Sequence, residues 1–168
     1  RTQVEASGNQ RRQLLSAIQA GATDVSAEIA RLEASRNINV LADVSAARWF
    51  NAFAEAARNE RNFTDAREFF RAAVEADPAN PTYHTGLALA NYEVGDFDAM
   101  AEEGAMLLVL APRTTNAWYV NCFAWAADPR MDRRMSAMAF HLALLFSEEA
   151  PKTRQRMVAE AKRKAGSP

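Results

Sequence analysis

The apolar residues between positions 61 and 80 recur at intervals of three and four. They are Phe63, Ala66, Phe69, Phe70, Ala73 and Val74. This spacing places them on one side of a helix, which we predict over residues 64–76. Pro78 ends the helix because it cannot donate the next backbone hydrogen bond, while Asn80 and Pro81 offer an N-cap and a first position for another helix. The stretch therefore predicts two consecutive helices joined by a short turn.

The same pattern returns 34 residues later. Gly95-Asp96-Phe97 stands where Arg61-Asn62-Phe63 stood, and Ala111-Pro112 stands where Asp77-Pro78 stood. A helix also precedes each of these units, and its residues match at the same interval: Phe50, Phe53, Ala54 and Ala57 correspond to His84, Leu87, Ala88 and Asn91. Each unit is therefore predicted to be a pair of antiparallel helices with its core on matching positions.

This repeat resembles the tetratricopeptide repeat (TPR) family. The resemblance rests on the small residues Ala54 and Ala88, the aromatic residues Phe63 and Phe97, and the prolines that close each unit. It implies an all-α fold, an α-solenoid of stacked antiparallel helix pairs with an N-terminal helix and a C-terminal capping helix. We expect repeats over 46–150, divided into 47–80, 81–114 and a degenerate third unit at 115–150, and a capping helix and tail over 151–168.

The third unit departs from the pattern. Trp118 takes the place of His84, and Cys122 takes the small-residue position, where we expect a buried, inert thiol. The turn at residues 128–132 is longer than the family norm, and the apolar spacing after it predicts a helix over residues 132–147.

Residues 1–45 precede the repeats and carry their own apolar seam. Its members, three and four apart, are Leu15, Ile18, Ala22, Val25, Ile29 and Leu32. We expect a frayed start over residues 1–12, one helix along the seam despite Gly21, and a linker over residues 35–45. Two interpretations stay open: the helix packs on the first repeat, or it pairs two chains as a short coiled coil.

Composition adds limits. The chain of 168 residues has a formal net charge of −1 and one cysteine, which excludes an intramolecular disulfide. No apolar run approaches the roughly 20 residues that span a bilayer. The chain begins at Arg1 rather than methionine, so we expect an excised or processed piece. Its compartment stays open between cytoplasm and periplasm, including the soluble part of a protein anchored through a segment outside it.

Residues for catalysis are scarce. His84 and His141 stand alone, and His84 falls at a core position of its repeat. The sequence has no metal-ligand spacing, no glycine-rich phosphate loop and no recognisable nucleophile context. We therefore predict a protein that is not an enzyme, with no catalytic residue, no metal and no cofactor.

The resemblance implies where a partner would bind, because in this family the first helix of each unit lines a concave groove. The outward positions of these helices are Arg48, Asn51, Glu55 and Arg58 in the first unit, Thr85, Leu89 and Tyr92 in the second, and Asn116, Tyr119 and Phe123 in the third. We predict that they hold a peptide or helix of a partner protein. Asn51 and Glu55 replace the lysine and asparagine of the family's carboxylate clamp, so binding of a chaperone tail is not predicted.

Charge is distributed unevenly. Residues 72–112 contain seven acidic and no basic residues, whereas residues 151–168 contain six basic residues against Glu160. Solvated faces and a docking surface for a charged partner both stay open. The basic stretch lacks interleaved aromatic residues and the net charge is negative, which argues against nucleic acid.

Two other functions stay open. One is a self-associating structural subunit, paired as a homodimer through the N-terminal helix, of a bacterial envelope or secretion complex. The other is the regulatory part of an enzyme whose catalytic domain lies outside this chain.

Overall fold

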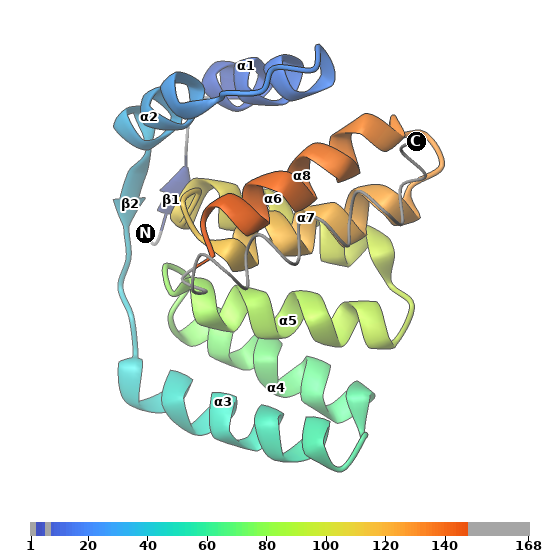
Figure 1. Cartoon of the computed structure of the whole chain (residues 1–168). Helices are drawn as coiled ribbons and strands as arrows, with labels where there is room; N and C mark the ends of the chain where they lie inside the picture. The colour runs from blue at the N-terminus through green and yellow to red at the C-terminus, as the bar shows by residue number, and fades with distance from the viewer. Residues whose placement is uncertain (1–2, 6–7, 148–168) are drawn as a thin grey trace.

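Paired helices stacked in chain order make up most of the protein. The structure is a computed structural model that describes residues 3–5 and 8–147 (Figure 1). Each helix of the stack packs on the next one along the chain. This confirms the predicted all-α solenoid of antiparallel helix pairs. The stacked helices are α3 (Val44–Asn59), α4 (Phe63–Ala76), α5 (Pro81–Glu93), α6 (Phe97–Leu110), α7 (Thr115–Ala127) and α8 (Arg133–Leu145).

The turns within the first two repeats have the same geometry 34 residues apart. Arg61 and Gly95 both adopt left-handed backbone conformations, with φ of 61° and 80°. The next residue caps the following helix in each case: the Asn62 side chain accepts from the Asp65 amide and the Asp96 side chain from the Ala99 amide. Glycine adopts this conformation without strain, which explains Gly95, whereas the first repeat holds an arginine there.

A buried hydrogen bond to the closing proline is repeated as well. His84 Nε2 lies 2.8 Å from the Pro78 carbonyl oxygen, and Trp118 Nε1 donates to the Pro112 carbonyl oxygen at 2.6 Å. His84 and Trp118 occupy equivalent positions, so the second and third repeats fix the turn before their first helix in the same way. In the third repeat α8 begins after Asp132, as the spacing predicts. The predicted capping helix in residues 151–168 lies outside the described residues.

Small residues mark the closest helix contacts. Ala54 and Ala88 are completely buried. Gly86 lies so close to α4 that a Cβ atom there would stand 2.3 Å from the Phe70 ring. Larger side chains at these positions would have to displace a packed neighbour.

Ala88→Leu should therefore destabilise the protein by about 1–3 kcal/mol, because the added carbons have no free space between the helices. Thermal unfolding followed by circular dichroism measures the change. Ala137→Leu, at an exposed position of α8, is the matched control and should leave the melting temperature nearly unchanged. Equal melting temperatures for Ala88→Leu and the unaltered protein would contradict this packing.

The N-terminal segment forms two helices, so the prediction of a single helix is wrong. α1 (Gly8–Gln19) and α2 (Ser26–Ser35) are separated by a turn in which Gly21 has φ of 83°. At the start of α2 the Asp24 carboxylate accepts hydrogen bonds from the Ser26 hydroxyl and amide, which lower the pKa of Asp24. Seam residues on both sides of the turn therefore face each other in a helical hairpin.

This hairpin packs on α8, at the opposite end of the stack from α3 (Figure 1). Ile18 and Ile29 share a core cluster with Met135 and Leu142 of α8. The expected packing on the first repeat is therefore wrong. The coiled-coil interpretation is wrong too, because these seam residues are buried within the chain: Ile18, Val25, Ile29 and Leu32, together with Leu14.

Ile18→Asp should undock the hairpin, because a buried carboxylate without a partner is costly. We expect a loss of about 2 kcal/mol, the lower end for a buried isoleucine, since the hairpin can swing into water. Hydrogen exchange should show lost protection in α1 and α2 and retained protection in α4 to α7. Gln19→Asp, at an exposed position, is the control. Unchanged protection of α1 in Ile18→Asp would contradict the docking.

A short two-stranded ribbon joins the ends of the stack. β1 (Gln3–Glu5) pairs antiparallel with β2 (Asn37–Asn39), Val4 opposite Ile38. The Arg36 guanidinium donates to the Leu110 carbonyl oxygen at 3.1 Å, and the Asp43 amide to the Ala76 carbonyl oxygen at 2.8 Å. These bonds fasten the linker along the side of the stack (Figure 1). The expected frayed start therefore contains an ordered strand and most of α1.

Candidate functional site

Four aromatic side chains form a continuous row across the stack. Ring centroids are 4.7 Å apart between Tyr119 and Phe123, 5.6 Å between Phe123 and Tyr92, and 5.8 Å between Tyr92 and Phe97. The contacts are tilted or edge-to-face, the arrangements that aromatic pairs prefer. We call these four residues the aromatic row. Tyr119, Tyr92 and Phe97 are 41%, 40% and 41% exposed, so the row is open to a partner along its length.

The helices bring the row together from three separate segments. Tyr119 and Phe123 lie one turn apart on α7, Tyr92 lies near the end of α5, and Phe97 is the first residue of α6. The hairpin of α1 and α2 packs on α8 instead of across these helices. The structure thus brings three of the predicted groove residues into contact, and partly buried Leu89 lies one turn before Tyr92 on the same side of α5. Phe97 was not predicted; its place across a tight turn from Tyr92 is the signal that could have found it.

A cavity of about 460 Å³ lies at the Phe97 end of the row. The turn between α5 and α6 and the turn between α7 and α8 enclose it. Its apolar wall comes from Phe97, Ala101, Ala124, Ala127 and Pro129. Its size and apolar wall suit one protruding side chain of a ligand better than a whole small molecule.

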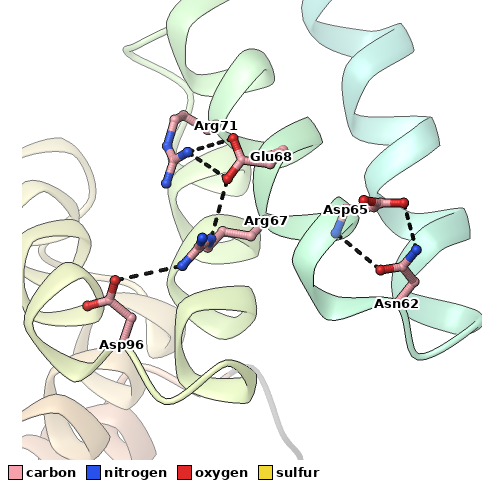
Figure 2. Close-up of polar contacts among 6 residues, drawn as sticks. All are labelled: Asn62, Asp65, Arg67, Glu68, Arg71 and Asp96. Carbon is pink, nitrogen blue, oxygen red and sulfur yellow. Dashed lines mark hydrogen bonds and ion pairs between the residues drawn. The ribbon is translucent and has the colours of Figure 1, made fainter.

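Charged side chains stand around this cavity. Asp128 accepts hydrogen bonds from the Arg130 side chain at 2.8 Å and from its amide at 2.9 Å, and these bonds lower the pKa of Asp128 and keep it ionised. Asp96 lies 3.8 Å from Arg67 of α4 (Figure 2). Asp98 has no ion partner within 4 Å in the part of the chain that the structure describes. Three carboxylates against two guanidinium groups give the rim a small negative excess.

Arg67 holds its place through neighbouring charges on α4. Its Nε lies 3.5 Å from Glu68, which also pairs with Arg71 at 2.7 Å (Figure 2). Asn62 and Asp65 hydrogen bond to each other separately, at the start of the same helix. Partly exposed pairs of this kind contribute little stability. Their role here is to orient Arg67 toward Asp96.

The remaining predicted residues lie away from the row. Arg48 is exposed on α3, Asn51 is partly buried, and Glu55 pairs with Arg58 on the same helix. Asn116 contributes to a different cavity of about 310 Å³, together with Arg113, Thr114, Thr115 and Phe146. None of the contacts found in the described residues joins these five side chains to the aromatic row, so their part in binding stays a prediction.

The buried polar residues have structural roles. His84 is buried, and its Nδ1 lies 2.6 Å from the Glu103 carboxylate. Cys122 is only partly buried, so the expected full burial is wrong, although its burial still raises the pKa of the thiol. The close contact between α6 and α7 is instead made by Gly104 and Asn121, whose side-chain amide donates to the Gly104 carbonyl oxygen at 2.8 Å. A serine or cysteine poised for nucleophilic attack would need an adjacent base, which Cys122 lacks among these contacts.

Two further searches of the described residues found nothing. Residues 3–5 and 8–147 contain no group of three histidine, cysteine, aspartate or glutamate side chains placed to hold a metal ion. Within the same part of the chain, no helix is both long and apolar enough to cross a membrane.

Comparison with solved structures identifies the fold. The chain is similar to the first TPR domain of Spaghetti (RPAP3) bound to the HSP90 peptide SRMEEVD, with a TM-score of 0.63, 15% identity, and coverage of 77% of this chain and 100% of that one. The Arabidopsis OM64 TPR domain gives a TM-score of 0.59 at 18% identity, covering 70% of this chain and 98% of that one. The Sgt2 TPR domain from Aspergillus fumigatus gives 0.56 at 20% identity, with coverage of 79% and 91%.

Sequence comparison adds no relative: no protein-family model and no curated protein matches the chain. The likeness to these structures is therefore one of fold. The protein is an α-solenoid with TPR-like repeats, as the spacing of 34 residues predicts.

Proposed function

We propose that the protein is a non-enzymatic interaction scaffold that holds a peptide or helix of a partner protein against the aromatic row. The observation that carries this proposal is the continuity of four touching rings, three of them about two-fifths exposed, with a cavity at one end. Soluble proteins rarely leave contiguous aromatic surface open unless a partner covers it. Tyr92 and Tyr119 add hydroxyl groups that can hydrogen bond to a ligand backbone.

The geometry also narrows the ligand. An apolar or aromatic side chain of the ligand would lie on the row, and a second one would enter the cavity beside Phe97. The rim acids Asp96, Asp98 and Asp128 favour a basic residue next to that anchor and repel acidic ones. The RPAP3 domain of similar fold binds an HSP90 peptide with two consecutive glutamates, so the fold can hold a peptide, but we expect a different peptide class here.

Selection from a random peptide library displayed on phage tests the proposal. The immobilised protein is the bait, and the Phe123→Ser variant serves for counter-selection, because serine removes the central ring of the row. We expect enriched peptides with an apolar anchor near lysine or arginine. Peptides that bind both proteins equally well would show that the row is not the binding site.

A structural subunit of a larger envelope or secretion assembly is the alternative. One observation favours it: the end of the stack at α3 presents exposed aromatic residues on a different face from the row. The two roles are compatible, because the two surfaces share no residue.

A further inference from the structure

The outer face of α3 carries an apolar stripe with no partner among the described residues. Trp49 is 67% exposed and Phe53 is 49% exposed, and Ala52 and Ala56 beside them are exposed as well. The Trp49 and Phe53 rings stack with centroids 6.2 Å apart, and Phe53 also contacts Phe69 of α4 at 5.7 Å. We call Trp49, Ala52, Phe53 and Ala56 the α3 stripe. Phe53 had been assigned to the core, and this assignment is wrong.

The same four positions are buried in both later repeats. Their equivalents are Tyr83, Gly86, Leu87 and Ala90 in α5, and Ala117, Val120, Asn121 and Ala124 in α7. They are buried because α5 stacks on α4 and α7 stacks on α6. No described helix precedes α3 in the stack, since the hairpin of α1 and α2 lies at the other end (Figure 1). The stripe is therefore a repeat-stacking face without a helix stacked on it.

The order of residues along the stripe makes it complementary to itself. Positions 45, 49, 52, 53, 56 and 60 share one side of α3, and their spacing reads the same in both directions. When two copies of α3 meet antiparallel across a two-fold axis between residues 52 and 53, Trp49 of one copy faces Ala56 of the other. Phe53 likewise faces Ala52. Each large ring then meets a small residue, the condition for close helix packing.

The charges at the ends of the helix favour the same arrangement. Arg48 flanks the stripe near the start of α3, and Glu60 follows its last residue. Antiparallel pairing brings Arg48 within about one turn of Glu60 of the other copy, whereas parallel pairing would set like charges together. The basic residues at 152–164 suit this face less well, because Arg48 and Arg58 border it.

We infer that the α3 stripe is a homodimer interface, on which a second copy of this chain packs its own α3. The surface is small: Trp49 and Phe53 are the only large side chains in it, and stable dimers bury about 800 Å² per partner. The dimer is therefore weak, with a dissociation constant on the order of micromolar. It leaves the aromatic row free in both copies.

Sedimentation velocity over a wide concentration range tests the dimer, with Trp49→Glu as the variant. Trp49 is mostly exposed, so the variant should fold, and its helical spectrum checks this. We expect the unaltered protein to shift from monomer to dimer as concentration rises and Trp49→Glu to weaken the dimer at least tenfold. Tyr119→Glu, an exposed aromatic residue of the row, is the matched control and should dimerise normally.

Cysteine cross-linking tests the geometry. In a Cys122→Ser background, Ala52→Cys lies beside the two-fold axis and should give a disulfide-linked dimer on mild oxidation, whereas Ala137→Cys on the exposed side of α8 should stay monomeric. A protein that is monomeric at all concentrations would overturn the inference, as would a dimer that survives Trp49→Glu or is lost only in Tyr119→Glu. A longer form of the chain that stays monomeric with Trp49 shielded from iodide quenching would also overturn it, by showing that another segment covers α3.

Discussion

Replacing Trp118 with alanine should destabilise the fold by about 3–5 kcal/mol, the range for a large aromatic residue removed from a core. Trp118 is completely buried in the largest core cluster, where α7 meets α6 and α8. The substitution also leaves the Pro112 carbonyl oxygen without the indole donor that it accepts from at 2.6 Å. Chemical denaturation followed by circular dichroism measures the loss.

Trp49→Ala is the matched control for this prediction. The same side chain is removed, but from a position that is 67% exposed. At low concentration, where chains are monomeric, its effect should stay within about 0.5 kcal/mol. Equal losses for the two variants would contradict the assignment of Trp118 to the core and of α3 to the open end of the stack.

Truncating the aromatic row should weaken ligand binding by roughly 30-fold for each of Tyr119→Ala and Phe123→Ala, which corresponds to about 2 kcal/mol. The expected loss is large because Phe123 touches both tyrosines and Tyr119 lies at the open end of the row. Isothermal titration calorimetry with a peptide from the library selection gives the affinities. Both variants should keep the helical spectrum of the unaltered protein.

Two controls separate the row from other surfaces. Trp49→Ala removes an exposed aromatic residue outside the row and should leave peptide affinity unchanged. Asp98→Asn removes one rim carboxylate and should weaken only peptides with a basic residue beside the anchor, by less than the ring truncations do. Equal affinities in the unaltered protein and Phe123→Ala would show that the ligand does not lie on the row.

Much of the repeat architecture can be predicted from the sequence, because its signals are local. Proline at position 78, the capping residues Asn62 and Asp96, and the spacing of apolar residues each fix a helix end or face within a few residues. Part of the row follows from the same logic: Tyr119 and Phe123 lie one turn apart, so a helical α7 places them together.

The rest depends on contacts between distant segments. A glycine inside a helix costs only about 1 kcal/mol, so Gly21 alone does not decide between one helix and two; docking of Ile18 and Ile29 on α8 does. The exposure of Phe53 could not be predicted from its match to Leu87, because periodicity shows the stacking face without showing which repeat lacks a neighbour. Three-residue strands such as β1 and β2 are too short for alternation to be recognised.

Mapping of a selected peptide by amide chemical-shift changes tests the central claim most directly, since it reports the position of the ligand without any substitution. The account predicts that the largest changes fall on α5, α7 and the start of α6, around Leu89, Tyr92, Phe97, Tyr119 and Phe123. Changes confined to the α3 stripe, or to the hairpin of α1 and α2, would contradict it.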